Sequence, residues 1–319
     1  MSETAVNGVE PIIFLDDVHV TFRTRTGSIL HPNLVHAVQG VTIKLMPGQT
    51  IGIVGESGCG KSITTLAIMG LTDEDEHLSG EVLWEGRDLL KMSKKEWFGL
   101  RGTDIAMVYQ DALSSLNPSM LISAQMKQLT KRGGTRSAEE LLELVGLDPK
   151  RTLESYPHEL SGGMLQRVLC AMAVSSKPEW ILADEPTKGL DEQVGAIVRK
   201  NLLTIKQDLH LSMLIITHDI ALAQEVCDDV LVMYAGQVLE HNADIWHKPL
   251  HPYTKGFLQA LPKNGLQVIP GKAPVPGESF TGCKFATRCP YCKTRCKKEV
   301  PAMQQVGNAE VRCFLYAEG

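Results

Sequence analysis

Residues 55–62 read Gly-Glu-Ser-Gly-Cys-Gly-Lys-Ser, a run of small residues that ends in one lysine and one hydroxyl. The spacing fits the G-x-x-x-x-G-K-[ST] pattern of phosphate-binding loops. Glycines let backbone N–H groups approach phosphate oxygens, where side chains would block them. Lys61 can then reach the β- and γ-phosphates, and the Ser62 hydroxyl can bind Mg²⁺. An ordinary glycine-rich turn is the alternative. The residues predicted to contact nucleotide here are Gly55, Glu56, Ser57, Gly58, Cys59, Gly60, Lys61, Ser62 and Ile63.

Two adjacent carboxylates, Asp184 and Glu185, follow the apolar residues 181–183. A carboxylate at the end of a strand beside a phosphate loop can hold Mg²⁺, directly or through water. The next carboxylate, Glu185, can polarise an attacking water as general base. The alternative is a pair of solvated acids at a strand end, which the phosphate loop upstream makes the weaker interpretation.

A second anion site is indicated by residues 160–167, Leu-Ser-Gly-Gly-Met-Leu-Gln-Arg, where a serine and two glycines open a helix. This segment resembles the signature motif of ATP-binding-cassette (ABC) ATPases. In that family the motif, here Ser161, Gly162 and Gly163, binds the γ-phosphate of ATP held by the opposite subunit.

The remaining motifs of the family occur in the same order along this chain. Gln110 resembles the Q-loop glutamine, which senses Mg²⁺ and water and faces the membrane subunits. Asp191 matches the D-loop, and His218 matches the switch histidine that contacts the γ-phosphate, although a lone histidine at a strand end is usually structural. The resemblance implies Lys61, Gln110, Glu185 and His218 as catalytic residues, and Ser62, Gln110 and Asp184 as Mg²⁺ ligands.

An aromatic residue often stacks on adenine at the end of the first strand in this family. Phe22 is the candidate for that role in this sequence, and His36 is a rival. Packing of Phe22 in the core is a third interpretation.

Three segments resemble the oligopeptide/dipeptide/nickel importer branch of the family: residues 110–118, 156–160 and 251–254. The resemblance covers roughly residues 12–259. It implies a subunit that hydrolyses ATP in a head-to-tail dimer with itself or a paralogue, beneath two membrane permeases, with an extracytoplasmic solute-binding protein as an indirect partner. The transported solute is not encoded in this chain.

Five of the eight cysteines crowd the last forty or so positions. In a chain without a secretory signal, such a group is more typical of metal binding than of disulfides. Cys283, Cys289, Cys296 and Cys313 resemble the C-terminal cysteines of the same branch, where four can hold a [4Fe–4S] cluster, and Cys292 is a possible substitute. Thiolates also suit tetrahedral Zn²⁺, and free thiols packed on the core are the third interpretation.

Composition supports a globular protein with 43% hydrophobic and 22% charged residues. A net charge of −5 argues against a general nucleic-acid or anionic-membrane binder. No run approaches the roughly 18 apolar residues of a spanning helix, and residues 1–4 lack a signal-peptide pattern. We therefore expect a peripheral protein on the cytoplasmic face of the membrane. The alternatives are a soluble ABC-type ATPase acting on nucleic acid or ribosomes, and an ATP-sensing regulatory module.

Alternating apolar strands and amphipathic helices should position these residues. Strands are expected at 12–22, 35–45, 50–54, 80–84, 105–109, 180–183, 212–217 and 230–234, and helices at 61–69, 138–145, 191–209 and 220–226. Residues 24–33 read as a long hairpin loop. The alternation predicts an α/β fold with a mainly parallel sheet. The resemblance implies a P-loop NTPase (RecA-like) core with an antiparallel β subdomain.

The predicted organisation has three parts. Residues 1–11 form a flexible leader, and residues 12–260 form the nucleotide-binding domain, with an inserted α-helical subdomain at about 111–175. A Pro/Gly-rich stretch from 262 to 282 then leads into a cysteine-rich extension, residues 261–319 overall.

Overall fold

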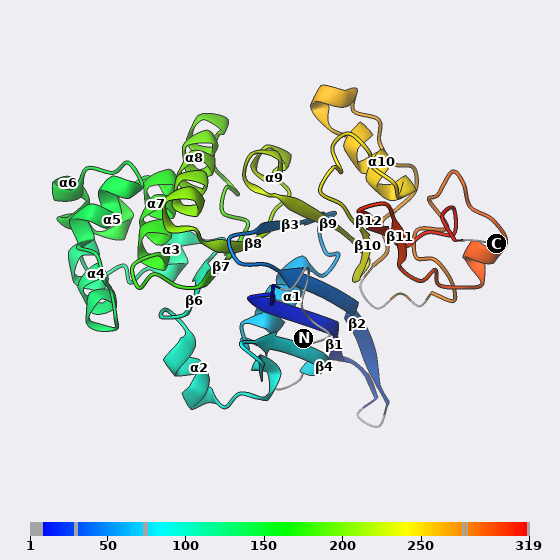
Figure 1. The fold of residues 1–319 in the computed structure, drawn as a ribbon, viewed down its shortest axis with the longest axis horizontal. Coiled ribbons are helices and arrows are strands. Elements are labelled where there is room, and N and C mark those ends of the chain that lie inside the picture. Colours follow the sequence, from blue (N-terminus) through cyan, green and yellow to red (C-terminus); the bar gives the residue numbers. More distant parts are fainter. Residues whose placement is uncertain (1–8, 29–30, 73–75, 276–277, 279, 318–319) are drawn as a thin grey trace. The chain divides into compact units, whose positions relative to one another are not determined.

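The computed structural model describes residues 9–28, 31–72, 76–275, 278 and 280–317 (Figure 1). Residues 1–8 of the predicted leader lie outside this part. The chain forms two units, and each is built from several separate segments of the sequence. One contains Lys44–Ile51 and Lys91–Cys227, with a short piece ending at Ile12; the other contains Ile13–Ile43, Gly52–Leu90 and the described residues from Asp228 onward. Strand β3 (Thr50–Gly55) begins in the first unit and ends in the second.

Three parallel strands lie at the centre of the first unit: β6 (Ile105–Val108), β7 (Trp180–Asp184) and β8 (Ser212–Ile216). Trp180 pairs with Ile105 on one side and with Ser212 on the other. Every residue of β7 and β8 is buried, as expected for parallel strands covered on both faces. The prediction of a parallel sheet is confirmed for these strands.

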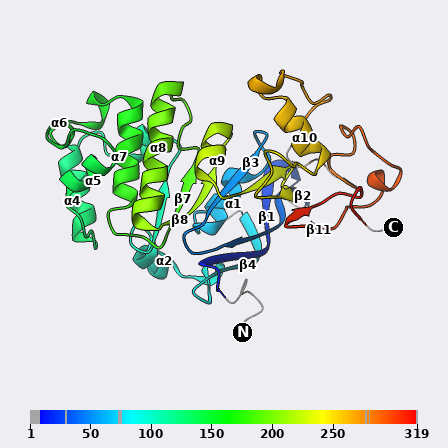
Figure 2. The ribbon, with the colours of Figure 1, turned by 45° about the horizontal axis from the view of Figure 1, so that its top comes forward.

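Helices occupy most of the remaining first unit, and Figure 2 shows α4 to α8 gathered together in green. Buried side chains join them to the strands in one hydrophobic cluster, which includes Val168, Val198 and Ile215. Because residues 111–175 share this core with the sheet, their separation as a subdomain stays a prediction. The helices are α2 (Lys94–Leu100), α3 (Ala112–Ser115), α4 (Ile122–Lys131), α5 (Ala138–Leu144), α6 (Pro149–Leu153), α7 (Gly162–Ala173), α8 (Glu192–Leu209) and α9 (Ile220–Val226), with a 3₁₀ turn at Pro157–Glu159.

Helix α5 begins at the predicted residue, Ala138, and ends at Leu144, one residue before the predicted end. The Ser137 hydroxyl accepts a hydrogen bond from the Glu140 N–H at 3.1 Å, and the Glu140 carboxylate accepts one from the Ser137 N–H at 2.8 Å. This reciprocal pair satisfies two of the N–H groups that every helix start leaves free. Gly146 follows the last turn with φ +67°, a left-handed conformation that glycine adopts without strain.

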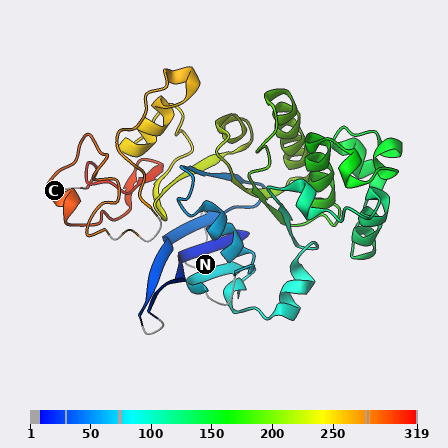
Figure 3. The ribbon, with the colours of Figure 1, turned by 180° about the vertical axis from the view of Figure 1, so that it is seen from behind.

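The second unit contains an antiparallel sheet in the order β2-β1-β4-β5, shown from behind in Figure 3. The predicted loop at 24–33 is wrong, because β1 continues to Ser28 and β2 already begins at His31. β2 is an edge strand, the part of a sheet in which proline is tolerated best. The elements are β1 (Ile13–Ser28), β2 (His31–Leu45), β4 (Glu76–Trp84), β5 (Arg87–Asp88) and helix α1 (Lys61–Ile68).

Four further antiparallel strands extend this unit in the order β11-β12-β10-β9. Strand β12 belongs to the cysteine-rich tail, and its Val311 pairs with Glu240 of β10. The sequence prediction ends the core before the tail, whereas the tail adds the β11–β12 hairpin to the sheet that contains β9 and β10. The sequence does not reveal these two strands, because three residues are too short to show a hydrophobic period. The elements are β9 (Asp229–Tyr234), β10 (Gln237–His241), α10 (Pro252–Gln259), β11 (Gln304–Val306) and β12 (Ala309–Val311), with 3₁₀ turns at Leu89–Lys91, Pro262–Asn264 and Arg295–Lys297.

Helix α7 packs against α8 at a glycine. A Cβ atom on Gly163 would lie 2.0 Å from Cγ1 of Val194, whereas one on Gly162 would meet only Cδ2 of Leu190 at 3.8 Å. Valine is stiff about χ1 in a helix, so Val194 cannot easily rotate away. The close approach of the two helices therefore depends on Gly163.

We expect Gly163→Ala to lower the free energy of unfolding by about 1–3 kcal/mol, because it overpacks this contact. Gly162→Ala is the matched control and should leave it nearly unchanged. Adding Val194→Ala to the Gly163→Ala variant should recover most of the loss in urea denaturation. Equal effects of the two alanines would contradict the steric explanation.

His241 at the end of β10 connects the sheet to the tail hairpin. Its Nε2 lies 2.7 Å from Oδ2 of Asp229, and its Nδ1 lies 3.4 Å from Oε2 of Glu310 in β12. Burial by itself would lower the pKa of His241, but the two carboxylates outweigh it and raise the pKa to about 9. The folded pKa thus exceeds the unfolded value, so this stabilisation is full below about pH 6.5 and is lost as the pH rises through 9.

We expect His241→Gln to lower the free energy of unfolding by about 1–3 kcal/mol at pH 6, and by much less at pH 10. Denaturation of both proteins at the two pH values measures the difference. His247→Gln, at an exposed ion pair with Asp244, should have little effect at either pH. A loss that is the same at pH 6 and pH 10 would show that His241 acts through packing.

Candidate functional site

Two glycines of the predicted phosphate loop, Gly55 and Gly60, are required by close backbone contacts within the second unit. A Cβ atom on Gly55 would lie 2.2 Å from the Met233 carbonyl oxygen, and one on Gly60 would lie 2.6 Å from that of Ala37. Gly60 also has φ +104° and stands just before the first residue of α1. The loop therefore runs from β3 to a helix N-terminus, as the sequence predicts for a phosphate site.

Lys61 lies inside this loop and not in solvent. Its side chain is 7% exposed, and Nζ donates to the carbonyls of Gly55 at 2.9 Å and Glu56 at 3.1 Å. Cys59 beside it is buried, which raises the pKa of its thiol. Glu56, Ile63 and the exposed Ser57, Gly58 and Ser62 complete the segment. The loop thus surrounds the Lys61 ammonium group and places it next to the carbonyl groups of the loop backbone.

Glu185 and His218 contact each other within the first unit. Glu185 directly follows β7, and its side chain is 10% exposed. Its Oε2 lies 2.5 Å from Nδ1 of His218 and accepts a hydrogen bond from the His218 N–H at 3.1 Å. The His218 side chain is 58% exposed. A nearly buried carboxylate is therefore held by a histidine whose far side faces solvent.

The neighbouring strands explain how these two residues meet. β7 and β8 are parallel, so the residues that follow them lie at the same edge of the sheet. The Glu185 N–H donates to the Ile216 carbonyl at 2.8 Å, which continues the ladder past β7. Glu185 has φ +49°, a conformation that costs a non-glycine residue energy and that often marks functional sites. Asp184, the last residue of β7, is 8% exposed.

Other predicted residues of the first unit lie at helix starts or next to them. Ser161 caps α7 by accepting from the Met164 N–H at 3.3 Å, and Asp191 caps α8 by accepting from Val194 at 3.0 Å. Gly162 is exposed, whereas Gly163 is buried against α8. Gln110 follows β6 and is exposed. The caps give Ser161 and Asp191 a structural function besides the predicted one.

These predicted residues fall into two sets by unit. Residues 55–63 belong to the second unit, and Gln110, residues 161–163, Asp184, Glu185, Asp191 and His218 belong to the first. Phe22 of β1 is partly buried, opposite Glu76 of β4. His36 of β2 is exposed, with Nδ1 3.0 Å from Oγ1 of Thr21. The choice of adenine-stacking residue stays a prediction.

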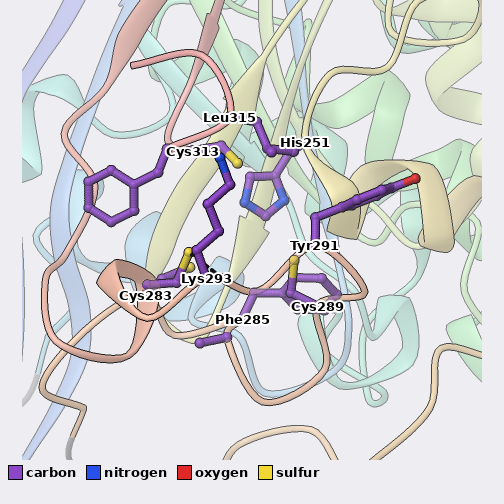
Figure 4. Close-up of a pocket in the computed structure, with 11 residues that line it drawn as sticks. His251, Cys283, Phe285, Cys289, Tyr291, Lys293, Cys313 and Leu315 are labelled. Carbon is purple, nitrogen blue, oxygen red and sulfur yellow. Dashed lines mark hydrogen bonds between the residues drawn. The ribbon is translucent and has the colours of Figure 1, made fainter. Parts of the chain in front are cut away.

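Four tail cysteines line one cavity of about 20 Å³ in the second unit, together with His251 and Lys293 (Figure 4). The four are Cys283, Cys289, Cys296 and Cys313. Burial, aided by the other thiols, raises the pKa of Cys283 to about 11. Burial of His251 lowers its pKa to about 3, so its ring is neutral.

Cys292 is not among the lining residues, and its thiol lies 3.6 Å from the Lys293 carbonyl oxygen. In the described part of the chain, no group of three or more His, Cys, Asp or Glu side chains is arranged to hold a metal ion. The described residues therefore show no metal site that supports the expected iron–sulfur cluster or zinc ion. The four cysteines predicted as ligands do line the same cavity.

Two residues for which the sequence predicts no contact with the phosphate loop lie against it in the structure. Arg288, next to Cys289, forms an ion pair with Glu56, with NH1 2.9 Å from Oε2. The Tyr253 hydroxyl accepts a hydrogen bond from the Glu56 N–H at 3.1 Å. The sequence carries no sign of this because these residues lie about 200 positions from the loop.

Among the helices that the structure describes, none is both long and apolar enough to cross a membrane.

The similarities to known proteins identify the family. A model described as ABC transporter matches residues 38–188, and one described as oligopeptide/dipeptide transporter, C-terminal region, matches residues 239–296. The chain is 41% identical to a dipeptide transport ATP-binding protein of Haemophilus influenzae over 87% of this chain and 89% of that one. It is 37% identical to one of Bacillus subtilis, over 96% and 95%.

The fold is similar to that of the ATP-binding cassette MJ0796, solved as a dimer in a post-hydrolysis state bound to ADP and Pi. That similarity has a TM-score of 0.62 at 26% identity and covers 72% of this chain and 97% of MJ0796. With the phosphate loop, the Glu185–His218 contact and the matching C-terminal region, these similarities show that the chain belongs to the ABC transporter family, as an ATP-hydrolysing subunit of the oligopeptide/dipeptide branch.

Proposed function

We propose that this protein powers the import of peptides or of nickel-type solutes, by hydrolysing ATP as one half of a head-to-tail dimer beneath two membrane permeases. Relatives named as dipeptide transport ATP-binding proteins, which align along most of the chain, support the solute class. The observation that carries the hydrolytic part is the Glu185–His218 contact. A subunit that only sensed ATP would have no need of it.

ATP phosphates bind to the N–H groups of residues 55–62 and to Lys61. In the structure Lys61 Nζ contacts two loop carbonyls, and a phosphate offers it stronger, charged partners. The proposed Mg²⁺ ligands are Ser62, Asp184 and Gln110, because these residue types offer the oxygen ligands that this ion prefers. When bound, Mg²⁺ neutralises charge on the β- and γ-phosphates.

Glu185 accepts a proton from the water that attacks the γ-phosphorus, while the bond from this phosphorus to the β,γ-bridging oxygen breaks and ADP leaves. Its carboxylate is nearly buried, so few solvent molecules compete for it, and His218 holds it in place. The exposed face of the His218 ring contacts the γ-phosphate. Residues 161–163 and Asp191 of a second subunit complete the site, because the start of α7 offers N–H groups to an anion.

The permeases contact the first unit around Gln110 at the membrane face. Two apolar side chains flank this glutamine and face solvent: Tyr109 is 42% exposed and Leu113 is 51% exposed. Exposed apolar side chains beside a polar residue are typical of protein interfaces. Closure of the dimer around ATP would pull on the permeases here, and release of products would reopen it.

We expect Glu185→Gln to reduce ATP turnover roughly 10²- to 10³-fold, because the amide cannot take up the proton. Binding of a fluorescent ATP analogue should stay within about threefold, since the amide oxygen still accepts from the His218 N–H. Phosphate release by the subunit with its co-expressed partners measures turnover. Glu139→Gln, at an exposed acid of α5, is the matched control. Undiminished turnover in the Glu185 variant would remove this residue from the mechanism.

Affinity purification of the tagged chain from its native membranes tests the transport assignment. We expect two permeases, a second ATP-binding subunit and bound peptide or nickel in the associated solute-binding protein. Recovery of ribosomes or nucleic acid in place of permeases would favour the alternative of a soluble ABC-type ATPase.

For the tail, we propose that Cys283, Cys289, Cys296 and Cys313 hold a metal centre, with a [4Fe–4S] cluster ahead of Zn²⁺. The convergence of four thiols on one cavity supports this, since thiolates are the usual ligands of such clusters. When bound, the centre would cross-link four segments of a tail that has little secondary structure of its own.

Protein purified without oxygen should then contain about four iron and four sulfide per chain and absorb visible light. Cys296→Ser should lose most of the iron, whereas Cys292→Ser should keep it, because Cys292 does not line the cavity. Zinc without iron would overturn the cluster assignment, and a chain with neither metal would leave four free thiols.

A further inference from the structure

The Arg288 guanidinium donates two hydrogen bonds to the carboxylate of Glu56. NH1 lies 2.9 Å from Oε2 and NH2 lies 3.1 Å from Oε1. This parallel two-bond arrangement is the strongest geometry available to an arginine and a carboxylate. The Arg288 side chain is 6% exposed and that of Glu56 is 27% exposed, so water competes little for the pair.

Arg288 is itself held in place by groups other than Glu56. Its Nε donates to the Pro270 carbonyl at 3.1 Å, and NH1 donates to the Tyr234 hydroxyl at 3.3 Å. Its guanidinium carbon also lies 5.7 Å from the centre of the Tyr234 ring. Although burial works in the opposite direction, the contacts with Glu56 and Tyr234 raise the pKa of Arg288 further, so the group stays charged.

Glu56 is held at its backbone as well as at its side chain. Its N–H donates to the Tyr253 hydroxyl at 3.1 Å, and its carbonyl accepts from Lys61 Nζ at 3.1 Å. Tyr253 is fully buried and packs against Tyr234 and Phe285, with ring centres 4.7 Å and 5.4 Å away. One residue of the phosphate loop is therefore attached to α10, to the tail and to the catalytic lysine.

We propose that Arg288 is a positioning residue for the phosphate loop, through which the C-terminal tail holds the loop in its ATP-binding shape. Without Arg288, the Glu56 side chain would be free to move and would keep an unneutralised negative charge in a loop that must bind an anion. Both effects weaken ATP binding. The inference deepens the proposed function, because it assumes that ATP binds to residues 55–62.

Arg288→Met tests this in the full-length chain with its co-purified partners. We expect the Kd for a fluorescent ATP analogue, with Mg²⁺, and the KM for ATP to rise about tenfold, which corresponds to about 1.4 kcal/mol. The kcat at saturating ATP should stay within about threefold, because the lost contact acts on binding and not on the attacking water. Arg288→Lys keeps the charge but not the fork, so its effect should be intermediate.

The double variant Arg288→Met with Glu56→Gln separates the loss of positioning from the effect of the unpaired charge. Removing the unpaired carboxylate should recover only the part of the loss that its charge causes, so the Kd should stay clearly above the wild-type value. Arg295→Met is the matched control, because Arg295 is a tail arginine with an ion pair to Glu299 at 2.8 Å but no contact with the loop. Its KM should equal that of the wild type.

Thermal unfolding distinguishes the remaining outcomes. A folded Arg288→Met protein with unchanged Kd and KM would overturn the proposal, as would an equal rise in the Arg295→Met control. A double variant whose Kd equals that of the wild type would show that the unpaired charge, and not positioning of the loop, causes the loss. Failure of the wild-type chain itself to bind ATP would instead refute the proposed function.

Discussion

A phosphate loop must present bare backbone to an anion, and this requirement shapes much of the second unit. The loop can carry few side chains of its own, so its conformation has to be held from outside. Close approach excludes any side chain at Gly55 and Gly60, where the backbone meets the carbonyls of Met233 and Ala37. The groups that hold the loop are Lys61, Tyr253 and Arg288, which come from three different segments.

The first unit solves a different problem, which is to keep a carboxylate reactive and in place at a sheet edge. Parallel strands bring the residues after β7 and β8 together, and Glu185 adopts a strained left-handed conformation there. His218 approaches this carboxylate with its ring and its backbone N–H. The side chain proposed to do the chemistry is thus positioned mainly by backbone geometry, which two well-packed strands make rigid.

The tail is more than an appendage, because it takes part in the sheet and in the site. Its hairpin pairs with β10, Glu310 reaches His241, and Arg288 reaches the phosphate loop. Four cysteines converge within this same segment. A tail with few buried hydrophobic residues and short strands gains order from such specific contacts, since its own core is small.

The sequence by itself determined the nucleotide motifs, the parallel strands β6 to β8 and the caps of α5, because each depends on residues close together in the chain. It made the hairpin loop at 24–33 too long, since Gly27 and Pro32 suggested a loop where β1 and β2 continue as strands. Only the tertiary structure decided that Glu185 meets His218, that the cysteines share a cavity and that Arg288 meets Glu56. Residues far apart in sequence carry no local pattern that records their contact, and only the packed fold brings them within hydrogen-bonding distance.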